Sequence, residues 1–374
     1  MNYKSVLKKE GINLITKLDD TAVSKIAEQI SNKLCSTFKE HNLNLDQLFC
    51  SISKLDMYYA EMPKDSSCAK YFSKTKSIYF SKDLSLDEMI SLGTHECLHF
   101  IQELCDNKGT AYKFGLYNLN SAGLAINEAA VQYMTSLTND SKSEKVKYFN
   151  IDLPTLSPVY YPLECSIINQ MVYFTGSYPL IHSTLYSDNV FKNTFISITS
   201  EKTYNQIIKN LDKILNLEDE LHFFTTELSY TEKLNQIKSL NKLILSYKQT
   251  ISEIYFETQN IILSNCFESE LKNVRTLEDL KDLKDKLYNY KNIIGYTENY
   301  EFYNNFYYYA MNEFEKKREY INVYGEINVL QQVLMPTVIE PVSVFSKFMF
   351  LIKKLFKVNS TKTQNYNFTQ TNYN

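Results

Sequence analysis

Apolar side chains recur at every third or fourth position in several parts of the chain, which is the period of an amphipathic α-helix. The earliest such stretch runs from about residue 21 to residue 41, and its apolar positions are Val23, Ile26, Ala27, Ile30, Leu34 and Phe38. We expect this stretch to form a helix that packs as an N-terminal cover.

The interval between Pro179 and Gly295 contains neither glycine nor proline, which favours long helices. It holds two apolar stripes: Ile237, Leu240, Ile244, Tyr247, Ile251 and Ile254, and then Leu280, Leu283, Leu287, Tyr290 and Ile294. Two such stripes predict an antiparallel helical hairpin with coiled-coil-like packing. Thr276 and Asp279 are placed to cap its second helix. Another helix is expected from 300 to 321.

Shorter apolar runs predict strands. Residues 48 to 62 are rich in aromatic side chains and end before Pro63, so we expect one or two strands there, over 51–53 and 56–60. Residues 69–72 and 77–80 flank the polar link 73–76 and predict a β-hairpin.

Two helices are expected after this hairpin. Ser85 and Glu88 form a capping box, the pattern in which each residue bonds to the other's backbone N–H at a helix start. A second helix is predicted from about 121 to 137. Between them, the polar stretch 105–119 is expected to be a loop.

The rest of the chain is less regular. Three prolines, Pro154, Pro158 and Pro162, predict an irregular crossing before a helical pattern that includes Ile167 and Val172. Residues 342–358 combine apolar side chains with lysines and no acid. They predict a basic amphipathic helix that lies on an anionic membrane surface or docks on the core. The polar tail 359–374 is expected to be disordered.

Composition narrows the class of protein. With 374 residues, of which 44% are hydrophobic, the chain is long enough for two or three packed units. Its beginning lacks an apolar signal core, and its seven cysteines have no regular spacing, so we expect a reducing, cytoplasmic location. Export by a signal-independent route stays open. A net charge of −3 gives no electrostatic case for nucleic acid. The oligomeric state is left open.

The chemistry centres on the segment His95-Glu96-Cys97-Leu98-His99. Residues four apart lie on the same face of a helix, so the two histidines can point their imidazoles at one metal ion. Cys97 turns away from that face and reads as a core residue.

A catalytic zinc ion takes three protein ligands and keeps one position open. Glu128, which follows His99 by 29 residues on the second predicted helix, is the best candidate for the third ligand. Gln132 follows one helical turn later, and its amide oxygen can accept the free ring N–H of His95.

These residues carry a resemblance to a known family. The HExxH segment, followed by Ala-Ile-Asn-Glu128-Ala, resembles the gluzincin metallopeptidases and is similar to the glutamate-ligand helix of thermolysin-like enzymes. The match covers only about residues 69 to 133. Such enzymes carry an aspartate one turn after the ligand glutamate. This chain has Gln132 there, which keeps an acceptor but loses a charge.

The resemblance implies an α+β fold that is mainly α. Its zincin-like core would hold a small mixed sheet and two metal-bearing helices, followed by a largely helical C-terminal half. We therefore divide the chain into an N-terminal helical segment (1–45), a catalytic core (46–200), a helical domain with the hairpin (201–340) and a basic segment with its tail (341–374).

The resemblance also implies roles for individual residues. Zn²⁺ would be held by His95, His99 and Glu128, and Glu96 would act as the general base. An edge strand beside the site would bind the peptide, and the implied strand is Ser77, Ile78, Tyr79 and Phe80. Tyr161 would stabilise the oxyanion, with Tyr160 and His182 as the other candidates.

We therefore expect a zinc-dependent metallopeptidase, either an endopeptidase or an aminopeptidase, that acts on a peptide or protein. Two alternatives belong to other classes. One is a non-catalytic zincin-fold protein that binds a partner through its helical half. The other is a membrane-surface or toxin-like effector peptidase that contacts membrane through 342–358.

Overall fold

The computed structural model describes residues 7, 11–63, 67–227, 230–296 and 301–325. The chain divides into two compact units, 1–318 and 319–374. The predicted domain boundaries at 45 and 200 both fall within the first unit. The predicted basic helix (342–358) and the tail (359–374) lie outside the described residues. The fold is mainly helical with small mixed sheets, as the α+β, mainly α prediction requires.

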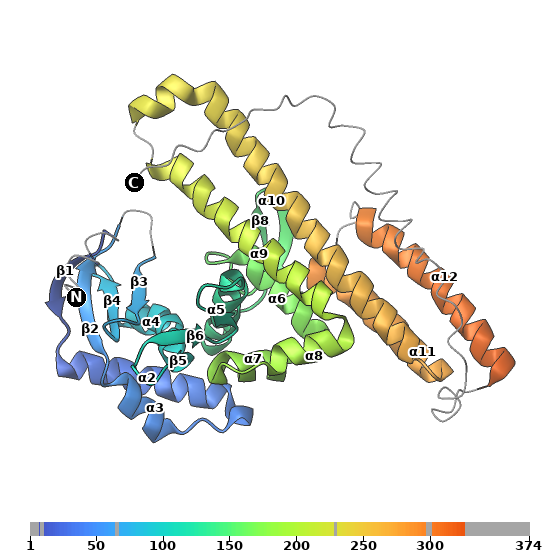
Figure 1. Ribbon diagram of the computed structural model, residues 1–374, viewed down its shortest axis with the longest axis horizontal. Coiled ribbons are helices and arrows are strands. Elements are labelled where there is room, and N and C mark those ends of the chain that lie inside the picture. The colour runs from blue at the N-terminus through green and yellow to red at the C-terminus, as the bar shows by residue number, and fades with distance from the viewer. Residues whose placement is uncertain (1–6, 8–10, 64–66, 228–229, 297–300, 326–374) are drawn as a thin grey trace. The chain divides into compact units, whose positions relative to one another are not determined.

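The N-terminal part is a four-stranded sheet with helices against it (Figure 1). Its elements are β1 (Asn13–Lys17), α2 (Asp20–Thr37), the 3₁₀ turn η1 (Lys39–His41), α3 (Leu45–Ile52), β2 (Asp56–Glu61), β3 (Ala69–Phe72) and β4 (Ser77–Ser81). The strand order is β1-β2-β4-β3, and only the β2–β4 pair is parallel.

The predicted N-terminal helix is confirmed as α2, which begins where the Asp19 side chain accepts the N–H of Ala22. The strand predicted over 51–53 is wrong, because these residues belong to α3 and the turn after it. The Asn44 side chain accepts the N–H of Gln47 and caps this helix, and such a local bond favours a helix over a strand. The strand predicted over 56–60 is confirmed as β2.

The hairpin predicted at 69–80 is confirmed, but the edge assignment is wrong. β4 pairs with β2 on one side and with β3 on the other, so it lies inside the sheet. Its Ser77, Ile78, Tyr79 and Phe80 side chains are 2%, 0%, 2% and 0% exposed. A strand covered on both faces carries a continuous apolar run, which is what these residues have. The edge strands are β1 and β3, and β3 is the one that pairs with β4.

The two predicted metal-bearing helices are α4 (Leu86–Ile101) and α5 (Leu124–Thr138). The capping box of Ser85 and Glu88 is confirmed at the start of α4. The segment predicted as a loop between the helices instead forms a three-stranded sheet of β5 (Glu103–Cys105), β6 (Ala111–Phe114) and β7 (Tyr117–Asn118). Tight turns around the glycines let a short polar sequence pair with itself.

The predicted irregular crossing is partly a hairpin of β8 (Glu144–Tyr148) and β9 (Ile151–Thr155). Pro154 is tolerated in β9 because this strand pairs only with β8, so one side needs no N–H donor. Helix α6 (Pro162–Thr175) follows, with a proline at its first turn, where the missing N–H costs nothing.

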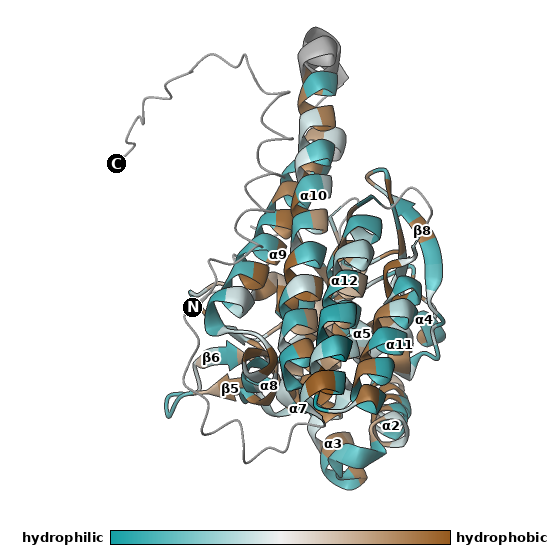
Figure 2. Cartoon of the chain, turned by 90° about the vertical axis from the view of Figure 1, so that its right-hand side faces the viewer, coloured by the Kyte–Doolittle hydropathy of each residue, from teal (hydrophilic) through white to brown (hydrophobic). Residues whose placement is uncertain are grey.

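The remaining elements are helices, as predicted. They are α7 (Ser177–Tyr186), α8 (Val190–Ile198), α9 (Glu201–His222), the π-helical turn η2 (Phe223–Glu227), α10 (Tyr230–Asn273), α11 (Leu277–Ile294) and α12 (Glu301–Tyr324). The predicted stripe of α11 is buried at all five positions, and its Thr276–Asp279 cap is present. However, α10 packs along α9 more extensively than along α11. Figure 2 shows apolar and polar residues interspersed along this helix pair.

Helix α5 lies between two apolar cores. Its Ala125, Ile126, Ala129, Ala130 and Tyr133 join the core formed with α6, α9 and α10. Val131 and Met134 join the core formed with α2, α4 and the N-terminal sheet. A helix that is packed on both sides is a rigid support for a functional side chain.

Among the described helices, none combines the length and the apolar content needed to cross a membrane.

Candidate metal centre

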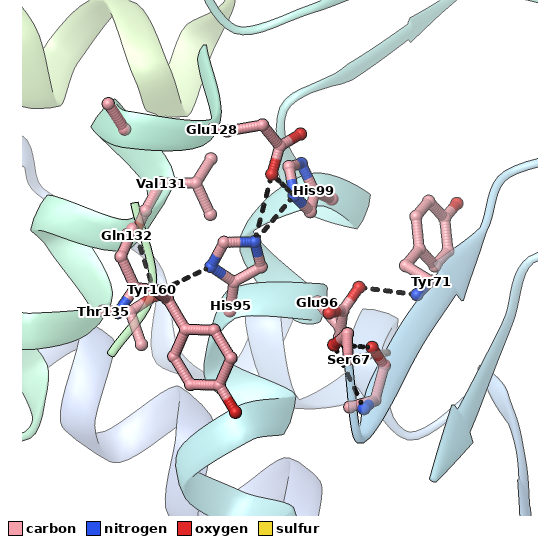
Figure 3. Close-up of polar contacts among 12 residues, drawn as sticks. Ser67, Tyr71, His95, Glu96, His99, Glu128, Val131, Gln132, Thr135 and Tyr160 are labelled. Atoms are coloured by element: carbon pink, nitrogen blue, oxygen red, sulfur yellow. Dashed lines mark hydrogen bonds and ion pairs between the residues drawn. The ribbon is translucent and has the colours of Figure 1, made fainter. Parts of the chain in front are cut away.

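Three donor atoms from α4 and α5 converge on one point (Figure 3). His95 Nε2 and His99 Nε2 are 3.0 Å apart. Glu128 Oε2 lies 3.4 Å from the former and 3.3 Å from the latter. The structure therefore brings together the three residues that the sequence predicted as ligands, and no other described group of His, Cys, Asp or Glu does the same.

The spacing of the three atoms suits a tetrahedrally coordinated metal ion. Ligands about 2.05 Å from a zinc ion lie about 3.3 Å from one another in that geometry. The observed separations of 3.0, 3.3 and 3.4 Å bracket this value. Two imidazoles and one carboxylate are also a donor set that zinc accepts in catalytic sites.

The ring of His95 is held by a chain of hydrogen bonds. Its Nδ1 lies 2.9 Å from Gln132 Oε1, which can only accept, so the proton is on Nδ1 and the Nε2 lone pair faces the centre. Gln132 Nε2 donates to Ser157 Oγ at 3.0 Å. Ser157 Oγ donates to the carbonyl of Tyr160 at 2.6 Å. This is the orienting contact predicted for Gln132, extended to a loop before α6.

The ring of His99 has an amide partner that the sequence did not predict. Gln102 Nε2 lies 2.8 Å from His99 Nδ1, and this arrangement leaves Gln102 Oε1 buried without a partner. Rotating the amide by half a turn would let Oε1 accept the Nδ1 proton, because the two amide atoms exchange places. His99 would then also present its Nε2 lone pair to the centre, so the orphaned oxygen favours a metal-binding tautomer.

Gly115 makes room for this amide. Its φ of +48° is left-handed, and a Cβ added there would overlap Gln102 Oε1 and come within 2.5 Å of Asn127 Oδ1. Ser187 Oγ holds the same corner by donating to the carbonyl of Gln102 and accepting the N–H of Gly115. A side chain at this position would therefore strain the backbone and displace the amides of Gln102 and Asn127.

Glu96 stands beside the donors and is not one of them. Its side chain is buried, and its Oε2 accepts the N–H of Tyr71 on edge strand β3 at 2.5 Å. Burial raises the pKa of Glu96 to about 7, although the nearby His95 and the Tyr71 N–H oppose the rise. The carboxyl is thus a proton acceptor held in a dry position.

Glu128 behaves differently, and it is half-buried where Glu96 is buried. Burial alone would raise its pKa, but the facing imidazoles of His99 and His95 hold the pKa of Glu128 well below its usual range. Two carboxyls in one site therefore differ in basicity because one faces the donor nitrogens and the other faces a backbone N–H.

A cleft of about 780 Å³ opens onto the donors. Edge strand β3 lines it with Ala69, Lys70 and Tyr71, whereas no residue of β4 does. Tyr160 and Tyr161 also line it. Tyr161 has a left-handed φ of 52° at the start of α6, and its ring stacks on His95 with centroids 6.4 Å apart. Burial, followed by the charge of Glu128, raises the pKa of Tyr161 well above its usual value.

His182 takes no part in this cleft. Its Nε2 lies 3.1 Å from Asp188 Oδ2, and its ring packs between Tyr178 and Tyr186. His182 therefore lies away from the donors. Of the three residues considered for stabilising the oxyanion, Tyr160 and Tyr161 line the cleft and His182 does not.

Sequence reasoning missed Gln102, Gly115 and Ser157. The sequence does carry a signal for Gln102. This residue lies three positions after His99 at the C-terminal end of α4, and residues three apart on a helix are neighbours. Ser157 and Gly115 reach the site through tertiary packing and carry no such local signal. No protein-family model, curated protein or solved structure matches this chain.

Proposed function

We propose that this protein is a zinc-dependent peptide hydrolase of the gluzincin type, built on a zincin-like core. One observation carries the proposal: two imidazole nitrogens and one carboxylate oxygen converge at tetrahedral spacing, and a fourth side chain, Glu96, stands next to them without joining them. A structural site would close the tetrahedron with another protein donor.

A zinc ion bound there supplies a Lewis acid for the scissile carbonyl and lowers the pKa of water. Glu96 takes the proton from the attacking water and returns it to the leaving amine. Gln132 accepts the Nδ1 proton of His95, and Gln102, with its amide rotated by half a turn, would accept that of His99, so that both Nε2 atoms are left unprotonated. Tyr161, whose ring stacks on His95 and lines the cleft, would donate a hydrogen bond to the oxyanion in this proposal.

The substrate follows from the shape of the cleft. Edge strand β3 lines it beside Glu96, so an extended peptide can align along β3 in the way that strands add to a sheet. This role replaces the one that the sequence assigned to Ser77–Phe80. The cleft is large enough for several residues of a peptide.

Zinc content measured on the purified protein tests the metal site. We expect about one zinc ion per chain, lost in His99→Ala and retained in His182→Ala, because His182 pairs with Asp188 outside the cleft. Equal zinc loss in His99→Ala and His182→Ala would contradict the assignment of the donors. A parent protein that binds no zinc would contradict it too.

Cleavage of a peptide library tests the chemistry. Glu96→Gln should keep zinc and lose at least about 100-fold in turnover, because the amide cannot accept a proton. A Glu96→Gln variant that hydrolyses peptides at the parent rate would rule out Glu96 as the base.

One observation favours a second function, a non-catalytic metal-binding protein. Glu96 Oε2 already accepts the Tyr71 N–H, a bond that would also suit a purely structural carboxylate. The two functions separate in the same experiment, since a zinc-loaded parent protein that cleaves no library peptide faster than Glu96→Gln would belong to the second class.

A further inference from the structure

The cleft has two unlike ends on either side of the donor atoms. One face of α5 runs along it, with Leu124, Glu128, Gln132, Thr135 and Asn139 at successive turns, all lining the cleft. Helix α4 runs in the opposite direction. Its Ser91 lies 3.0 Å from Asn139, its His95 lies 2.9 Å from Gln132 and its His99 lies 3.3 Å from Glu128. The cleft therefore continues past the donors at both ends of α5.

The end near the C-terminus of α5 is polar and made of small side chains. It is lined by Ser91, Thr135, Ser136, Asn139 and Ser141. The end near the N-terminus of α5 is apolar, with Leu119, Leu124 and Leu215. A substrate that occupies both ends meets hydroxyls and an amide on one side of the reacting bond and leucines on the other.

Helix α9 closes the apolar end. Asp212 of α9 accepts the N–H groups of Gly123 and Ala125 at 2.7 and 3.0 Å, which fixes α9 against the start of α5. Leu215 follows one turn later on α9 and Asp219 one turn after that, and both line the cleft. Leu215 and Asp219 therefore lie on one face of α9, and they line the same cleft as Leu119 and Leu124.

Asp219 is the carboxylate of the cleft that has no task at the metal centre. Glu128 is a donor, and Glu96 faces Tyr71. No described side chain forms a hydrogen bond or an ion pair with Asp219. The groups that face it are Tyr161 and Glu164 of the α6 start, Glu218 beside it and His222 one turn along α9.

This position suits a cation. Asp219 is an exposed residue that lines the cleft, so its carboxylate can be reached by a ligand. Partial burial raises the pKa of Asp219, and only His222 opposes the rise. A carboxylate that lines a cleft without a described partner can accept a hydrogen bond from a charged donor, which is stronger than a bond between neutral groups. Long basic side chains have an apolar stem that packs on leucines and a charged head that reaches a polar group.

We propose that Leu119, Leu124, Leu215 and Asp219 form the side-chain subsite of the cleft and select a lysine or arginine residue of the substrate. The inference rests on the proposed peptidase function and adds its substrate class. The leucines contact the aliphatic stem, and Asp219 accepts hydrogen bonds from the ammonium or guanidinium group.

Rates on N-acetylated peptides that differ at one residue test the subsite. The peptides carry lysine, arginine, norleucine or glutamate at each position around the cleaved bond. We expect kcat/KM for lysine to exceed that for norleucine by about 10- to 100-fold at one position, the range for a hydrogen bond to a charged group. Asp219→Asn should bring this ratio close to one, and Asp219→Lys should make glutamate the preferred residue.

Glu220→Gln is the matched control, because it removes a neighbouring carboxylate of α9 that bonds Tyr247 and does not line the cleft. It should leave the lysine-to-norleucine ratio unchanged. Binding gives a second readout. Glu96→Gln, with zinc, should bind a fluorescent lysine peptide more tightly than its norleucine counterpart by a similar factor, and adding Asp219→Asn should remove the difference.

Three results would overturn the inference in distinguishable ways. Cleavage without a basic preference, or with a preference that survives Asp219→Asn, would show that the subsite is wrong while the peptidase function stands. Activity that is lost on N-acetylation and indifferent to lysine would show that the carboxylate binds the peptide amino terminus instead. Absence of cleavage above the Glu96→Gln level for every peptide would overturn the proposed function, and the subsite with it.

Discussion

Replacing Glu164 by glutamine tests whether this buried carboxyl, which has no described ion-pair partner, makes the stability of the fold depend on pH. Glu164 lies on α6 with 0% of its surface exposed, beside Glu218 of α9. No described residue forms an ion pair with either carboxyl. Burial raises the pKa of Glu164 to about 7. Burial, with the charge of Glu164 added, holds the pKa of Glu218 well above its usual range.

The sign of the effect follows from proton binding. Glu164 has a reference pKa of 4.5 and a folded-state pKa of about 7, so the folded chain binds this proton more tightly than the unfolded chain. The stabilisation is fully present below pH 4.5 and is lost as the pH rises through about 7. A shift of this size corresponds to about 3 kcal/mol.

Glutamine has the same shape and no charge, so Glu164→Gln should escape this loss. We expect the free energy of unfolding of Glu164→Gln, relative to the parent, to be about 2 to 3 kcal/mol more favourable at pH 8 than at pH 5. Urea unfolding at both pH values, with a chelator present throughout, measures this difference without a contribution from zinc binding.

Glu220→Gln, on the exposed side of the same helix pair, controls for the simple loss of a carboxylate from this region. If Glu164→Gln changes the free energy of unfolding by the same amount at pH 5 and at pH 8, the carboxyl titrates alike in the folded and unfolded chains. The reasoning from burial would then be refuted.

Two further predictions concern the support of the metal site. Gln132→Ala should weaken zinc binding by about 10- to 100-fold, measured by competition with a chromophoric chelator, because His95 loses the acceptor that fixes its tautomer; unchanged affinity would show that the contact is incidental. Gly115→Ala should lower both the melting temperature and the zinc affinity, because its Cβ displaces Gln102, whereas Gly109→Ala, with a φ of +77° and open space around it, should show only backbone strain of about 1 kcal/mol. Equal effects of the two alanines on zinc affinity would contradict the steric argument.

Features set by neighbours in the sequence could be predicted. The four-residue spacing of His95 and His99 needed only the helix period, and the capping boxes at Ser85 and Thr276 needed only residues three apart. The buried stripe of α11 followed from its repeat as well. In each case the interacting groups lie within one or two turns, so local geometry fixes them.

Features set by distant segments were predicted poorly or not at all. The run Ser77–Phe80 predicted a strand. Because this strand pairs with both β2 and β3, it lies inside the sheet, and β3 forms the edge next to it. The apolar stripe of α10 predicted a helix that packs against α11, but this helix packs more extensively against α9. An apolar face indicates that something covers it and does not say what.

The sequence alone determined the donor types of the site: two imidazoles on one helix face, an adjacent carboxyl and a glutamate on the next helix. The tertiary structure decided that these atoms meet at 3.0 to 3.4 Å, that Gln102 contacts the His99 ring while Ser157 holds Gln132 against His95, and that Asp219 lines the same cleft. The reason is physical. Backbone periodicity is a property of neighbouring residues, whereas convergence depends on which apolar faces pack together, and that choice is made by the whole core.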